Sequence, residues 1–134
     1  MQLNKLLSTM DTLLGENGCP WDKEQTHESL QKYMLEECNE AIDAINRQDM
    51  DELKEELGDV LLQVVFHAKI AEKAGHFTIE DVIAGIVNKL TSRHSHIFGN
   101  DIATTPDEVL ALWQKNKEKE REFKVSLHKM AQTT

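Results

Sequence analysis

Four acidic residues stand out in this sequence because they form two pairs with the same spacing. Glu37 and Glu40 are three residues apart, and so are Glu56 and Asp59. If both segments are helical, each pair projects from one face of its helix. The two pairs also lie symmetrically about position 48, so corresponding members are equally far from that point in the chain. This symmetry is what a hairpin of two helices would need in order to bring the pairs together.

A short connection between two helices favours an antiparallel hairpin, in which residues equidistant from the turn lie at the same height. Packed helices are about 8 to 10 Å apart, so all four carboxylates can converge on one cleft. Converging carboxylates repel one another unless a cation lies between them or one of them takes up a proton. Oxygen ligands favour hard cations such as Mg²⁺ or Mn²⁺. The spacing therefore predicts a divalent metal site.

The same acids could instead form the solvated faces of two amphipathic helices, which is the usual role of a charge run. Ion pairs within a helix, such as Asp43 with Arg47, would then support them. The mirror symmetry favours the cleft. So does Gly58, because glycine inside a helix costs about 1 kcal/mol and suggests a close backbone approach at that position. The two interpretations differ in whether the carboxylates meet.

The elements that must position these residues are helical, because apolar residues recur at helical spacing and strand patterns are almost absent. We expect an all-α fold of about five helices, in which the second (about 28–46) and the third form the hairpin. Loops are expected at 15–20 and about 95–105. Thr78 and Thr105 are expected to cap the fourth and fifth helices. The third helix carries an apolar stripe that consists of Leu53, Leu57, Val60, Leu61, Val64, Val65 and Ala68.

Length and charge limit the possible functions. The chain has 134 residues and a formal net charge of -9, and residues 36–59 contribute ten acids and two bases. This balance argues against binding to nucleic acid polymers or to anionic membranes. The sequence shows neither a membrane span nor a secretory leader, and its two cysteines lack metal-ligand spacing. We therefore expect a cytoplasmic protein with one domain over residues 1–122 and a flexible tail over 123–134.

Three segments of the chain resemble the MazG nucleotide pyrophosphohydrolases of the all-α NTP pyrophosphatase superfamily. The family pattern Glu-Glu-x-x-Glu, a spacer and Glu-x-x-Asp corresponds to residues 36–40 and 56–59. Gly-Cys-Pro-Trp-Asp at 18–22 and Arg-His-Ser-His-Ile-Phe-Gly at 93–99 are also similar to MazG sequences. The resemblance covers roughly residues 1–122 and is to the first domain of members that carry two tandem copies.

The resemblance implies hydrolysis of a nucleoside triphosphate to the monophosphate and pyrophosphate. It implies Mg²⁺, with Mn²⁺ as a possible substitute, held by Glu37, Glu40, Glu56 and Asp59. Glu36 is adjacent to this set and is a candidate general base or supporting residue. A homodimer or larger homo-oligomer is also implied.

The substrate would be bound by further residues. By the resemblance, Lys89 and Arg93 would contact phosphates; the family often has two arginines at this place, whereas this chain has Ser92 before Arg93. Trp21 and Trp113 are candidates to stack on a base, although either could instead pack in a core or an interface. Tyr33 lies one helical turn before Glu37 and could line the same cleft.

The sequence is also compatible with two other functions. A tandem copy can lose activity and keep its fold, so the chain could be a structural or interaction domain. A carboxylate-bridged iron or manganese protein is a weaker alternative, because such sites need two Glu-x-x-His pairs and only Glu24 with His27 has this spacing.

Overall fold

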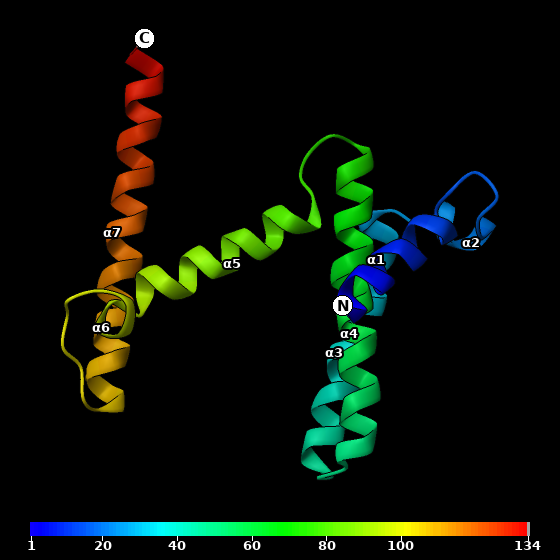
Figure 1. Ribbon diagram of the computed structural model, residues 1–134, viewed down its shortest axis with the longest axis horizontal. Coiled ribbons are helices and arrows are strands. Elements are labelled where there is room, and N and C mark those ends of the chain that lie inside the picture. Colours follow the sequence, from blue (N-terminus) through cyan, green and yellow to red (C-terminus); the bar gives the residue numbers. More distant parts are fainter. Residues whose placement is uncertain (134) are drawn as a thin grey trace. The chain divides into compact units, whose positions relative to one another are not determined.

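The computed structural model describes residues 1–133 (Figure 1). These residues form seven helices and no strand, which confirms the all-α prediction. The helices are α1 (Gln2–Leu13), α2 (Pro20–Lys23), α3 (His27–Asn46), α4 (Met50–Lys73), α5 (Ile79–Arg93), α6 (Ser95–Phe98) and α7 (Pro106–Thr133). The sequence missed α2, which follows the loop expected at 15–20, and α6, which lies in the loop expected at about 95–105. Each is a single turn, too short for an apolar period to show.

The chain divides into two compact units, with the boundary inside α5. The first unit runs from Met1 to Val82 and contains α1 to α4; the second begins at Ile83 and contains α6 and α7. The helix α7 continues without a break to Thr133. The segment predicted as a tail, 123–134, is therefore helical as far as it is described.

The first unit is built on an antiparallel hairpin of α3 and α4, which lie side by side (Figure 1). Small and apolar side chains fill the space between these helices and α1, and the buried ones are Met10, Leu30, Ala41, Ala44, Val65, Phe66, Ala68 and Ala71. The stripe predicted on the third helix is only partly buried, because Leu57, Leu61 and Val64 are exposed.

The turn of the hairpin sets the register of α3 against α4. Gln48 lies at its centre with a φ of 56°, a left-handed conformation that lets the chain reverse direction. The Asp49 side chain then caps α4 by accepting a hydrogen bond of 3.1 Å from the backbone N–H of Glu52. Arg47 forms an ion pair with Asp43 at 2.9 Å. The hairpin midpoint expected from the spacing of the acids is therefore confirmed.

The ends of α4 and α5 follow the predicted signals. Gly75, with a φ of 80°, ends α4. Thr78 and Asp81 form reciprocal hydrogen bonds between side chain and backbone at the start of α5. The same local chemistry begins α7, where the Thr105 hydroxyl accepts from the backbone N–H of Glu108. Within the described residues, none of the helices combines the length and hydropathy needed to cross a lipid bilayer.

Candidate metal centre

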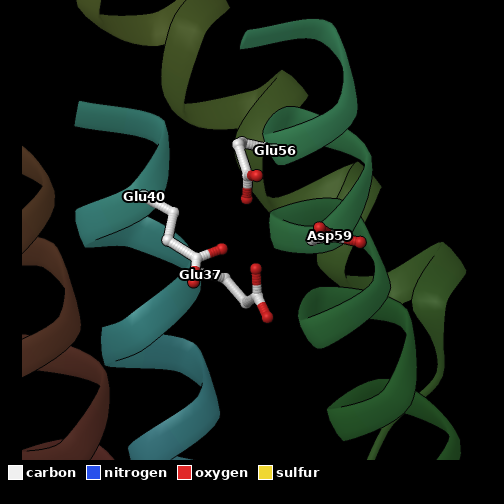
Figure 2. Close-up of side chains that lie close together, drawn as sticks. All are labelled: Glu37, Glu40, Glu56 and Asp59. Carbon is white, nitrogen blue, oxygen red and sulfur yellow. The ribbon is translucent and has the colours of Figure 1, made fainter. Parts of the chain in front are cut away.

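The structure brings the two acidic pairs together, with Glu37 and Glu40 on α3 and Glu56 and Asp59 on α4 (Figure 2). Each of these residues has a carboxylate oxygen within 4.8 Å of an oxygen of every other member. We call this group the four-carboxylate cluster. In Figure 2 the carboxylates of Glu37, Glu40 and Glu56 face the space between the two helices.

Two oxygens of the four-carboxylate cluster are buried without a partner. Among the described residues, the Oε2 atoms of Glu37 and Glu56 contact neither solvent nor any hydrogen-bond donor. Glu56 is 7% exposed as a residue, whereas Glu40 and Asp59 lie at the surface. None of the ion pairs in the described part of the chain involves a member of the cluster. The protein thus supplies four acids and no counter-charge.

The crowding of these acids changes their protonation. Contact with Glu40, burial, and contact with Glu52 raise the pKa of Glu56 to about 8. Burial also raises the pKa of Glu37, and the charges of Asp59 and Glu40 add to this effect. Without a cation, Glu56 therefore holds a proton at neutral pH that a lone surface carboxylate would lose.

These properties fit a hard divalent cation. The donors are all carboxylate oxygens, which is the ligand type that Mg²⁺ and Mn²⁺ prefer. Two of the oxygens are buried and lack hydrogen bonds, so a cation would satisfy atoms that nothing else in the described structure satisfies. The arrangement can hold a metal ion and, through it, the phosphates of an anionic ligand.

The surroundings of Gly58 and the contact of Glu52 with Glu56 differ from what the sequence predicted. A side chain added at Gly58 would meet no atom of the described residues within 4 Å, so the expected close backbone approach is absent from the structure. The sequence also missed Glu52, whose carboxyl group contacts Glu56 and contributes to its raised pKa. The spacing of Glu52 and Glu56, four residues apart on α4, was a sign that could have indicated this contact.

Glu36 takes no part in the four-carboxylate cluster. It precedes Glu37 on α3, its side chain is exposed, and it is absent from the group of converging oxygens. Consecutive residues of a helix point about 100° apart, which accounts for this difference. A role for Glu36 in catalysis would therefore be exercised beside the cluster and not as one of its four converging ligands.

A cavity of about 360 Å³ borders the cluster in the first unit. Its lining includes the predicted aromatic residues Trp21 and Tyr33, together with Glu37 of the cluster and Gln63 of α4. The Trp21 and Tyr33 rings meet edge to face, with centroids 5.8 Å apart. Trp21 is 51% exposed, so its ring is not part of a closed core.

The other predicted substrate residues belong to the second unit. Lys89 is exposed on α5. The Arg93 guanidinium forms an ion pair of 3.2 Å with Glu120 and lies 5.0 Å from the centre of the Trp113 ring. Contacts of these three residues with a substrate at the four-carboxylate cluster stay a prediction.

A carboxylate-bridged iron or manganese site would need a second Glu-x-x-His pair, and the described residues do not form a metal-binding group that contains histidine. His27 lies 2.7 Å from His67, measured between their Nδ1 atoms, and the two rings are stacked. Within residues 1–133, the one group of three or more acids, histidines or cysteines close enough to hold a metal ion is the four-carboxylate cluster. The Glu24 and His27 pair therefore has no matching partner there.

Known proteins with similar sequences include nucleotide pyrophosphohydrolases, which is consistent with a metal centre made of carboxylates. The MazG nucleotide pyrophosphohydrolase domain matches residues 25–98. The nucleoside triphosphate pyrophosphohydrolase of Escherichia coli is 49% identical over 121 residues, which are 90% of this chain and 46% of that protein. The nucleoside triphosphate pyrophosphohydrolase/pyrophosphatase MazG of Thermotoga maritima is 50% identical over 122 residues, which are 91% of this chain and 46% of that protein. The chain thus spans less than half the length of these curated relatives.

The fold is also similar to a solved structure. The crystal structure of a mazG-related protein from Thermotoga maritima superposes with a TM-score of 0.72 and 25% sequence identity, over 86% of this chain and 98% of that one. The matched domain spans more than half of this chain and includes all four carboxylates. The chain therefore belongs to the MazG nucleotide pyrophosphohydrolase domain family.

Proposed function

We propose that this chain hydrolyses nucleoside triphosphates to the nucleoside monophosphate and pyrophosphate. Water would attack the α-phosphorus, the bond between that phosphorus and the bridging oxygen would break, and pyrophosphate would leave. The observation that carries the proposal is the four-carboxylate cluster, whose buried oxygens lack partners among the described residues. The names of the Escherichia coli and Thermotoga maritima relatives support this class of reaction.

The proposed cofactor is Mg²⁺, for which Mn²⁺ could substitute. Glu37, Glu40, Glu56 and Asp59 would hold it. When bound, the cation would neutralise phosphate charge and make a bound water more acidic. Without it, four carboxylates would repel a triphosphate. Glu36 is the proposed general base for the attacking water or, as the alternative, a residue that supports a ligand of the cation.

The base of the substrate would occupy the cavity beside the cluster. Trp21 and Tyr33 offer aromatic surface on which a base can stack, and Glu37 joins this cavity to the proposed metal centre. Lys89 and Arg93 are proposed to bind phosphates, and Trp113 is proposed as a second stacking residue. All of these residues lie in the proposed catalytic domain, residues 1–122.

A second copy of the chain is the proposed partner. Large apolar side chains are exposed along α3 and α4, and a water-soluble helix pair gains free energy by covering them. They are Leu35, Ile42, Ile45, Leu57, Leu61 and Val64. The open space beside Gly58 lies on the same stretch of α4 and would admit a second backbone. A homodimer or larger assembly would follow.

The proposed role is regulation or cleaning of the nucleotide pool in the cytoplasm. The two cysteines, Cys19 and Cys38, are free and half-buried, which is compatible with a reducing compartment.

Product analysis tests the proposal. The protein is incubated with a panel of triphosphates and Mg²⁺, and the products are separated by ion-exchange chromatography. Monophosphate with pyrophosphate is expected. Diphosphate with phosphate would contradict the cleavage position, and the absence of turnover would favour a structural domain whose active copy lies elsewhere in a longer protein.

A further inference from the structure

Gln63 is a buried polar residue that the four-carboxylate cluster does not use. It lies on α4, one helical turn after Asp59, and is 7% exposed. Among the described residues, its amide oxygen Oε1 contacts neither solvent nor a hydrogen-bond donor. A buried amide oxygen without a partner destabilises the free protein, so its presence calls for a physical reason.

The surroundings of Gln63 suggest that reason. Its side chain lines the cavity of about 360 Å³ that also contacts Trp21, Tyr33 and Glu37. This volume lies within the range of about 300 to 1,000 Å³ that is typical of small-molecule sites. Such sites are mainly apolar and carry a few polar groups that fix the orientation of the ligand. The rest of the lining is largely apolar, so Gln63 is well placed to be one of these groups.

We propose that the carboxamide of Gln63 reads the hydrogen-bonding edge of the nucleobase. This inference rests on the proposed function, because that function makes the cavity beside Glu37 the base site. A primary amide presents an acceptor and a donor side by side, which matches a base edge with an adjacent N–H and ring nitrogen or carbonyl. Oε1 is out of reach of solvent in the free protein, so a rotation of the carboxamide would present it to an N–H of the base, while the aromatic rings contact the face of the base.

The expected kinetic effect is on binding. The base is remote from the bond that breaks, so its hydrogen bond contributes equally to the ground state and the transition state. Gln63→Leu, which keeps the size of the side chain and removes its polar atoms, should raise KM for nucleoside triphosphates about tenfold, the effect of one hydrogen bond. Its kcat should change less than about twofold.

A substrate without a base separates this role from a structural one. Ribose 5-triphosphate keeps the sugar and the three phosphates and offers nothing for Gln63 to read. We expect wild type and Gln63→Leu to have the same KM for it. If Gln63→Leu raises KM for the base-free substrate as much as for the nucleotides, or leaves every KM unchanged, the proposal is overturned.

Gln31→Leu is the matched control, because Gln31 is an exposed glutamine on α3 and lines none of the cavity. It should leave every KM unchanged. Thermal unfolding of the free proteins adds a second readout. Gln63→Leu removes the unpaired oxygen and should unfold at or above the wild-type temperature. A lower unfolding temperature together with a general loss of activity would show that Gln63 only supports the fold.

Failure of the proposed function can be told apart from failure of this inference. If wild type hydrolyses no triphosphate, the reaction is wrong, and binding is then measured by calorimetry with Mg²⁺ and an α,β-methylene nucleoside triphosphate. Weaker binding by Gln63→Leu, with equal binding of ribose 5-triphosphate, would still support base reading by Gln63. Equal binding of the nucleotide by both proteins, or no binding by wild type, would overturn it.

Discussion

The two units of this chain each contain a cluster of charged side chains, and the two clusters have opposite environments. In the second unit, Glu120 accepts a hydrogen bond from the Ser92 hydroxyl and pairs with Arg93 at 3.2 Å. The Ser92 hydroxyl and then the Arg93 guanidinium lower the pKa of Glu120. In the first unit, the four-carboxylate cluster forms no ion pair with the described residues, and the pKa values of Glu37 and Glu56 are raised.

The paired charge of Glu120 stabilises the fold of the free protein. The unpaired acids of the four-carboxylate cluster are stabilised only when a cation or a proton binds. Where the protein provides a partner, the ionised form is stabilised in the free molecule. Where it provides only like charges, the ionised form is destabilised until a cation or a proton arrives. The packing of the hairpin must offset that cost in the free protein, because it holds the four acids close together.

The largest effect should come from neutral replacements of cluster ligands. Glu40→Gln and Asp59→Asn should each lower turnover of nucleoside triphosphates at least about 100-fold, because each removes a charged ligand of the proposed cation. Circular dichroism should show unchanged helicity. Glu55→Gln is the matched control, since Glu55 is an exposed glutamate on α4 outside the cluster, and it should keep full activity. Full activity in either ligand variant would refute the metal assignment.

Metal binding should depend on pH in the direction set by the raised pKa values. Protons compete with the cation below the pKa of Glu56, which is about 8, so the affinity for Mg²⁺ should rise from pH 6 to about pH 8 and then level off. Calorimetry in buffers of different ionisation enthalpy should detect proton release at pH 6 and little at pH 9. A chelator should abolish turnover. Affinity that is independent of pH would show that the cluster is already ionised without metal.

Replacement of Glu120 should lower stability, in contrast to the acids of the first unit. Glu120→Gln removes the charge that pairs with Arg93 and should lower the free energy of unfolding at pH 7 by about 2 kcal/mol, the size of a hydrogen bond to a charged group. Glu118→Gln, an exposed neighbour on α7, should change it little. Denaturant unfolding measures both. An unchanged stability of Glu120→Gln would remove the contrast between the two clusters.

The metal-free protein should become less stable as pH rises from about 4.5 to about 8. The pKa of Glu56 is raised from 4.5 in the folded chain, so the folded state binds more protons than the unfolded state across this window. The stability contributed by protonated Glu56 is complete below 4.5 and is lost as pH passes about 8. Glu56→Gln should make stability depend less on pH. At pH 8, added Mg²⁺ should stabilise the wild-type protein but not the Glu56→Gln variant. A wild-type profile without this decline would contradict the raised pKa.

The smallest effect concerns the turn that sets the register of the cluster. Gln48 has a φ of 56°, which costs a residue with a side chain about 1 kcal/mol relative to glycine. Gln48→Gly should therefore stabilise the protein by up to about 1 kcal/mol and leave turnover unchanged. Gln31→Gly, in the second turn of α3, should destabilise it by a similar amount. Loss of activity in Gln48→Gly would contradict this expectation and would mean that the Gln48 side chain, and not only the backbone conformation of the turn, is needed to position the acids.

Much of the first unit could be predicted from the sequence because its determinants are local. The spacing of Glu37 with Glu40 and of Glu56 with Asp59 depends only on helix geometry. The short connection at Gln48 determines which residues of α3 lie opposite which residues of α4. The sequence did not predict α2 and α6, because each is a single helical turn. It wrongly predicted a close backbone approach at Gly58, because such an approach depends on how other segments pack against α4.

The remaining features depend on packing between residues far apart in the chain. The missing partner of the Gln63 amide oxygen cannot be inferred from spacing, because it results from the packing of α4 against its neighbours. The pKa of Glu56 likewise depends on Glu40 of the other helix. Periodicity and spacing determined that four acids would meet on a helical hairpin, since both act within a few turns of the chain. Tertiary structure decided which of their oxygens lack partners and which cavity lies beside them, because burial is a property of the packed molecule.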